Sequence, residues 1–233
     1  MIIKLQQDLR KVATPEKAKA SAWFFKTGKG QYGYGDKFLG VTVPEQRKIA
    51  QGYKDLGLNE IKKLLQSEFH EERLVALFIL VSKFEKGNDK EREKIYKFYL
   101  DNAKYINNWD LVDLTAPNIV GKFLLDKDKF ILYQLVKSQN LWERRISILA
   151  TFSFIRENQF KETLEISKIL LTDKHDLIHK AVGWMLREIG KRNEKVLKDF
   201  LKEHYKTMPR TMLRYAIEKF PKNLRDKYLK GEI

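Results

Sequence analysis

Residues 142–171 read WERRISILATFSFIRENQFKETLEISKILL. Apolar residues recur every three or four positions from Trp142 to Phe154 and again from Phe160 to Leu171. This is the spacing of one face of an α-helix. Only a short polar connection separates the two runs, and the turn Thr172-Asp173-Lys174 closes the second one. The stretch therefore predicts two consecutive helices that pack as a pair.

The same pattern continues through most of the chain after Pro44, in helical runs of roughly 10–18 residues with no alternating strands. Pairs of runs recur at roughly 35–40-residue intervals, which is typical of HEAT-like repeats. We expect an all-α fold, an α-solenoid of antiparallel helix pairs with a concave binding face, as one domain over residues 1–233. A compact helical bundle is the competing architecture. The further expected helices cover residues 72–84, 91–100, 131–136, 178–189, 196–205 and 209–220.

The chain of 233 residues is strongly basic, with 46 Lys and Arg against 31 Asp and Glu and a net charge of +15. Such an excess favours a polyanionic partner, namely DNA, RNA or an anionic membrane. It concentrates in residues 190–233, although a solvated Lys-rich surface is the ordinary explanation for any single lysine. There is no cysteine, which excludes a disulfide framework and thiolate chemistry. Without an apolar run of membrane-spanning length or a signal sequence, we expect a cytoplasmic monomer that does not bind membranes.

A glycine-rich stretch, KTGKGQYGYGD at residues 26–36, interrupts the helical rhythm. A dinucleotide-binding fingerprint would need a preceding strand and a helix opening at its end, and neither is evident. The stretch, with Lys29 and two tyrosines, is suited to following a phosphate backbone and stacking on a base. The alternative is a turn that reverses the chain between two helices.

The segment NNWDLVD, which starts at Asn107, is the strongest candidate for chemistry. Trp109 and Asp113 are four residues apart, so on a helix both side chains leave the same face. An indole beside a carboxylate suits a site that holds a sugar or base and opposes a positive charge. Asn107 and Asp110 have the spacing of a capping box, which makes Asp110 a helix-start residue. Pro117 cannot donate to the carbonyl of Asp113, so we expect the helix to be broken there.

Two further groups combine tryptophan with arginine. In Trp142-Glu143-Arg144-Arg145, Arg145 is placed to pair with a phosphate or with Asp113, or else to form a surface ion pair. In Gly183-Trp184-Met185-Leu186-Arg187-Glu188, an isolated tryptophan on a helix is more often a core residue than a ligand contact.

No cofactor or metal site is expected. His175 and His179 share a helical face, but no third ligand has suitable spacing. No histidine lies near a hydroxyl nucleophile in the sequence, so a hydrolase triad is unsupported.

Three motifs together resemble the signature of the AlkD-like DNA alkylation repair glycosylases, which are built from HEAT-like repeats. These motifs are Trp109-Asp110-x-x-Asp113, Trp142-Glu143-Arg144-Arg145 and Gly183-Trp184-x-Leu186-Arg187-Glu188. The segment FLGVTVPEQR at residues 38–47 also resembles that family's N-terminal motif. The similarity extends from Ala18 to Arg214.

The resemblance implies a glycosylase that excises positively charged N3- and N7-alkylated purines from duplex DNA. It makes Asp113 the catalytic carboxylate, which opposes an oxocarbenium-like transition state. It places Trp109 and Trp184 beside the deoxyribose of the lesion and Arg145 on the DNA backbone.

The resemblance also suggests a set of DNA contacts. Phe24, with Trp23 alongside, stands in the place of the family's tyrosine, and the glycine-rich loop is longer than in the best-known members. Two alternatives are a non-catalytic HEAT-repeat protein that binds damaged or branched DNA, and a protein scaffold. The expected DNA-binding residues are Arg47, Lys29, Phe24, Arg144 and Arg187.

Overall fold

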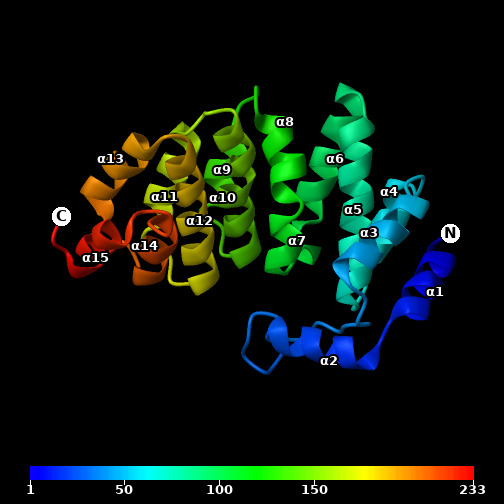
Figure 1. Ribbon diagram of the computed structural model, residues 1–233. Helices are drawn as coiled ribbons and strands as arrows, with labels where there is room; N and C mark the ends of the chain where they lie inside the picture. The colour runs from blue at the N-terminus through cyan, green and yellow to red at the C-terminus, as the bar shows by residue number, and fades with distance from the viewer. The chain divides into compact units, whose positions relative to one another are not determined.

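The computed structural model describes residues 1–233 and is all-α, with no β-strand and one isolated bridge between Lys37 and Phe69 (Figure 1). None of its helices is long and apolar enough to cross a membrane. The chain divides into two compact units, residues 1–115 and 116–233. The all-α, helix-pair architecture predicted from the sequence is confirmed.

The first unit contains α1 (Ile2–Val12), α2 (Pro15–Phe24), α3 (Val43–Gly52), α4 (Leu58–Leu65), α5 (His70–Lys86), α6 (Asp89–Asp101), the 3-10 turn η1 (Ala103–Tyr105) and α7 (Trp109–Asp113). The second contains the π-helix η2 (Pro117–Gly121), α8 (Lys122–Leu124), α9 (Phe130–Leu135), α10 (Leu141–Arg156), α11 (Lys161–Leu170), α12 (Asp176–Arg192), α13 (Glu194–His204), α14 (Arg210–Ala216) and α15 (Lys222–Lys230).

Helix α5 is the centre of the first unit. It packs against α3, α4, α6 and α7, and α1 covers α3 and α5. Its run Leu74–Leu80 is buried on every face, because neighbours surround the helix. The first turn of α5 is also buried although it is polar, and this turn organises the candidate site described below.

Helix α2 differs from the others because none of its residues is buried. Pro15 starts it, a position where the missing amide hydrogen costs nothing. Gly40 is in the left-handed region, with φ of +84°, and a Cβ there would lie 2.1 Å from the Thr14 carbonyl oxygen and 2.5 Å from the Ala18 nitrogen. Only glycine allows the chain to pass so close to the start of α2.

The second unit is built around α10 and α12, which pack against each other. Helix α10 also contacts η2, α9 and α11, and α12 also contacts α11, α13 and α14, so successive helices lie side by side in chain order (Figure 1). Gly183 permits the close approach of α14, because a Cβ there would lie 2.5 Å from the Met212 carbonyl oxygen. This is the α-solenoid arrangement.

The predicted helices are found with small shifts in their ends. The pair predicted from residues 142–171 is α10 and α11, for example, and the run predicted from residue 72 begins two residues earlier, at His70. The glycine-rich stretch does connect two helices, α2 and α3. Helices α1 and α2 are absent from these predictions. Helix α1 does carry apolar residues at helical spacing, with Leu5 and Leu9 buried, so its pattern was readable, whereas α2 buries no residue.

Candidate functional site

The short helix α7 carries both residues of the candidate pair, Trp109 and Asp113. Trp109 is its first residue, Asp113 is its last, and both side chains are half-buried. The N-cap is Asn108, whose side-chain oxygen accepts a hydrogen bond from the Trp109 amide at 2.8 Å. The predicted capping box between Asn107 and Asp110 is therefore not formed, because the N-cap lies one residue later, at Asn108.

The end of α7 is fixed from inside the unit. The α-helix stops at Asp113, and a π-helix begins at Pro117, so the predicted break is confirmed. The Thr115 hydroxyl donates to the Leu111 carbonyl at 2.5 Å and also bonds the buried Tyr99 hydroxyl at 2.9 Å. These bonds hold the turn that follows Asp113.

An aromatic column supports the indole of Trp109. Phe25 stacks on it with ring centres 5.3 Å apart, and Phe24 meets it edge-on at 5.9 Å. Phe25 also contacts the imidazole of His70 at 4.9 Å and the ring of Phe38 at 5.2 Å, and His70 and Phe38 lie 4.8 Å apart. The position of Trp109 therefore depends on residues that flank the glycine-rich loop.

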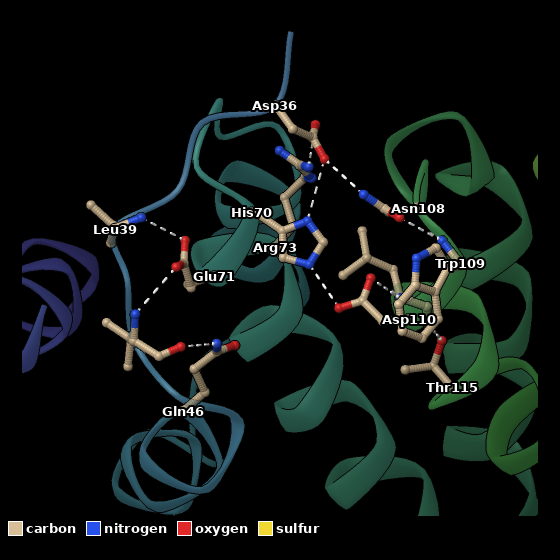
Figure 2. A network of polar contacts seen from close by, with 12 residues as sticks. Asp36, Leu39, Gln46, His70, Glu71, Arg73, Asn108, Trp109, Asp110 and Thr115 are labelled. Carbon is tan, nitrogen blue, oxygen red and sulfur yellow. Dashed lines mark hydrogen bonds and ion pairs between the residues drawn. The ribbon is translucent and has the colours of Figure 1, made fainter. Parts of the chain in front are cut away.

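A buried ionic cluster, shown in Figure 2, joins the loop to α5 and α7. His70 lies between two carboxylates, with Nε2 2.8 Å from Asp110 and Nδ1 3.3 Å from Asp36. Arg73 donates to the second oxygen of Asp36 at 2.7 Å, and Asn108 donates to Asp36 at 3.1 Å. We call these five residues the Asp36 clasp.

The charges of the clasp stabilise one another. Burial disfavours a charged imidazole, but the charge and hydrogen bond of Asp110, with the hydrogen bond to Asp36, outweigh it and raise the pKa of His70 to about 9. Burial likewise works against the Asp36 carboxylate, yet His70 and Arg73 hold its pKa below the usual value. His70 is thus an imidazolium at neutral pH.

The clasp gives Asp110 a different role from the one predicted. It does lie in the first turn of α7, and one oxygen accepts from the Leu111 amide at 2.9 Å. Its other oxygen binds His70, however, and the residue is only 6% exposed. Because the carboxylate points into the protein, Asp110 anchors α7 and does not form the predicted capping box with Asn107.

The segment at residues 38–47 is held by the first turn of α5. The buried Glu71 carboxylate accepts from the amides of Leu39 at 2.9 Å, Gly40 at 2.8 Å and Val41 at 3.3 Å. Most of this motif therefore shapes the backbone. Arg47 is exposed, and its guanidinium lies 4.2 Å from the centre of the Phe78 ring.

Within the second unit, Arg145 and Trp184 lie on the packed helices α10 and α12. Arg145 is only 4% exposed and donates to the Leu177 carbonyl, so it lies inside the unit and not on its surface. Trp184 is half-buried, packs against Phe152 at 5.7 Å between ring centres, and donates from Nε1 to Glu188 at 3.2 Å.

The expected DNA-binding residues fall into two groups. Lys29 and Phe24 are exposed, as is Arg47. Arg144 instead bonds Asp173 at 2.7 Å and the carbonyls of Ser138 and Gln139, which braces two turns. Arg187 is paired with Glu218 and is mostly covered.

The two histidines considered as metal ligands have local structural roles. The Nδ1 atom of His175 accepts from the Leu177 amide at 3.1 Å and caps α12. The Nε2 atom of His179 lies 2.5 Å from the Asp173 carbonyl. No cluster of three His, Cys, Asp or Glu side chains suited to a metal ion is present.

The sequence reasoning missed the clasp. The signal was the tetrapeptide HEER at residues 70–73, where four consecutive polar residues open an apolar helix. All four are buried, with exposures between 1% and 4%. Because charged residues are rarely buried without partners, only knowledge of their burial would have marked them.

The fold defines the chain as an α-solenoid of helical repeats. A family model described as DNA alkylation repair enzyme matches residues 5–220, and the chain belongs to this family. The family is one of DNA repair enzymes, and DNA is the substrate that it implies.

Two solved structures share the fold. A predicted DNA alkylation repair enzyme from Enterococcus faecalis is 17% identical, with a TM-score of 0.70 over 90% of this chain and 97% of that one. The protein smu.31 from Streptococcus mutans UA159 is 24% identical, with a TM-score of 0.53 over 76% of this chain and 92% of that one. A comparison with curated protein sequences gave no match.

Proposed function

We propose that this protein is a monofunctional alkylpurine DNA glycosylase that excises positively charged N3- and N7-alkylated purines from duplex DNA. The observation that carries the proposal is the pairing of Trp109 and Asp113 at the two ends of α7, each half-exposed. Asp110, the other carboxylate of the helix, points inward to His70 and is unavailable to a substrate.

The chemistry asks for little more than a carboxylate. An N3- or N7-alkylated purine is cationic and already a good leaving group, so no strong general acid is required. As the glycosidic bond breaks, positive charge develops on the deoxyribose, as in glycoside hydrolysis. The Asp113 carboxylate stabilises that charge and orients the attacking water. The face of the Trp109 indole attracts the cationic sugar.

The surroundings of α7 support such a role. The aromatic column contacts the Trp109 indole, and the Asp36 clasp holds α7 through Asp110. The indole is therefore preorganised before DNA binds. In the second unit, Trp184 is half-buried, whereas Arg145 is only 4% exposed, so of these two residues only Trp184 is open to a DNA contact. The net charge of +15 supplies the long-range attraction to phosphate.

The test is release of 7-methylguanine from methylated duplex DNA by the wild type and by Asp113→Asn. We expect release to fall by at least about 100-fold, because the amide has no charge to oppose the oxocarbenium ion. DNA binding should remain. Asp101→Asn is the matched control, since Asp101 also ends a helix, α6, but is exposed and away from α7.

Unchanged release by Asp113→Asn would overturn the mechanism. No release by the wild type, with retained binding to methylated or branched duplexes, would overturn the glycosylase assignment in favour of a non-catalytic DNA-binding protein.

A further inference from the structure

Helix α2 and the glycine-rich loop, residues 15–36, form a segment that we call the aromatic arm. It contains the exposed side chains of Trp23, Phe24 and Tyr34, which are 82%, 56% and 67% exposed. Isolated apolar side chains are common on protein surfaces. Three large aromatic ones within twelve residues are a concentration that the interior of the protein does not explain, and two of them end a helix with no buried residue.

The arm is ordered although it contributes little to the core. Asp36 fixes its end through the clasp, Phe25 stacks under Trp109, and Gly40 closes against its start. A ten-residue helix is marginal by itself, so these contacts hold it in place. The loop is also closed on itself, because the Gly33 amide donates to the Lys26 carbonyl at 3.2 Å. Trp23 therefore projects from a segment whose two ends are held in place.

The charge of the arm selects the partner. It carries Lys17, Lys19, Lys26 and Lys29 against Glu16 and Asp36, and Asp36 is already neutralised inside the clasp. Exposed aromatic rings interleaved with lysines are the pattern of surfaces on which bases stack while phosphates are bound. An acidic protein surface would use only the lysines, and a purely apolar one would use only the aromatic rings.

The location of the arm indicates which kind of base it would bind. The Phe24 and Trp109 rings meet edge-on with their centres 5.9 Å apart, so the end of α2 borders the proposed catalytic helix. Bases in intact duplex DNA stack on one another and offer no free face. A base that has lost its pairing partner is held less firmly in the stack and exposes a face when it turns out of the helix. Such a base is created wherever the opposite nucleotide leaves the helix or is removed.

We propose that Trp23 is a stacking platform for an unpaired nucleobase of the DNA next to the nucleotide held at Trp109 and Asp113. The inference rests on the proposed function for its location. It adds a binding site for the base opposite the lesion, on the undamaged strand, outside the catalytic residues. The clasp sets the distance between this site and α7.

The experiment measures equilibrium binding to a duplex that contains one tetrahydrofuran residue, a stable mimic of an abasic site, opposite 2-aminopurine. Trp23→Ala should bind this duplex about tenfold more weakly than the wild type, a typical value for one lost base–aromatic stack. Binding to the fully paired duplex should change much less. Trp23→Phe should restore most of the preference.

Two readouts separate stacking from charge. The fluorescence of 2-aminopurine should be quenched by the wild type and less so by Trp23→Ala. The slope of log K against log salt should stay the same for Trp23→Ala but decrease for Lys29→Ala, because only the lysine displaces counterions. Phe130→Ala is the control, since Phe130 is 62% exposed but lies on α9 in the second unit.

The probe needs no base release, so the result is independent of the glycosylase test. Equal loss on both duplexes, or no loss on either, would overturn the stacking site. Loss on the tetrahydrofuran duplex by a protein that releases no 7-methylguanine would keep the stacking site and reject the proposed activity. Wild-type-like unfolding by urea shows that the Trp23 variant is folded.

Discussion

Helices α2 and α5 belong to the same unit and are built on opposite principles. In α5 even the polar first turn is buried, and its charged side chains hold three segments outside the helix. Glu71 binds residues 39–41, Glu72 binds α1 through Gln6 and Arg10, and His70 and Arg73 bind Asp36. In α2 nothing is buried, and two adjacent aromatic rings face solvent.

The two helices therefore have different roles: α5 anchors other segments, and α2 exposes side chains to a ligand. Buried charges on α5 are expensive to desolvate, and they persist because each is bonded to a partner. They specify where the arm and α7 stand. The exposed rings of α2 contribute little to folding, so they are available to a ligand. Loss of an α5 partner should therefore cost stability, whereas loss of an α2 ring should cost binding.

The largest effect is expected for Glu71→Ala. Three backbone amides would lose their acceptor inside the protein, and we expect the free energy of unfolding to fall by about 3 kcal/mol or more. Urea unfolding measures it. Glu68→Ala is the control, because Glu68 forms only an exposed ion pair with Lys37 and should change stability by no more than about 0.5 kcal/mol. Similar losses for both variants would contradict the anchoring role.

An intermediate effect concerns pH. Because the pKa of His70 rises from 6.5 to about 9 on folding, its stabilisation is complete below pH 6.5 and disappears as pH rises through about 9. The unfolding free energy should fall by up to about 3 kcal/mol across that window. Asp36, Asp110 and Arg73 are the charged groups that face the ring.

His70→Gln should remove most of this pH dependence, since glutamine does not titrate. Urea unfolding at pH 6, 7.5 and 9 for both proteins provides the measurement. A wild-type slope that persists in the variant would mean that other groups are responsible and that the clasp does not titrate as described.

The smallest effect is expected for the stability of Trp23→Ala. The side chain is 82% exposed, so its removal should change the free energy of unfolding by no more than about 0.5 kcal/mol. A variant that keeps its stability but loses DNA binding would be the clearest evidence that α2 serves binding and α5 serves stability. A loss as large as that of Glu71→Ala would show that α2 is structural.

Much of the fold follows from local sequence patterns. The apolar spacing in residues 142–171 was sufficient to predict α10 and α11, because amphipathic helices need only a correctly spaced apolar face. The break after Asp113 followed from Pro117. Helix α2 could not be predicted in this way, since it buries no residue and carries no apolar face. Its stability comes from contacts of distant residues, such as Gly40.

The candidate site divides similarly. The spacing of Trp109 and Asp113 marked both as neighbours on one helix, and the helix was found. The inward orientation of Asp110, the burial of Arg145 and the pairing of Arg187 were not readable, because each depends on a partner far away in the sequence. Arg144 belongs with them, since Asp173 lies 29 residues further along.

By itself, the sequence determined that the chain folds into paired helices, carries a strong positive charge and places an indole and a carboxylate one turn apart. Periodicity, composition and proline chemistry are local or additive properties that need no knowledge of long-range contacts. Only the tertiary structure decided that Asp36, His70 and Asp110, spread over 75 residues of chain, form one buried clasp behind Trp109. Burial and pairing of charges are properties of the folded surroundings, so no single segment encodes them.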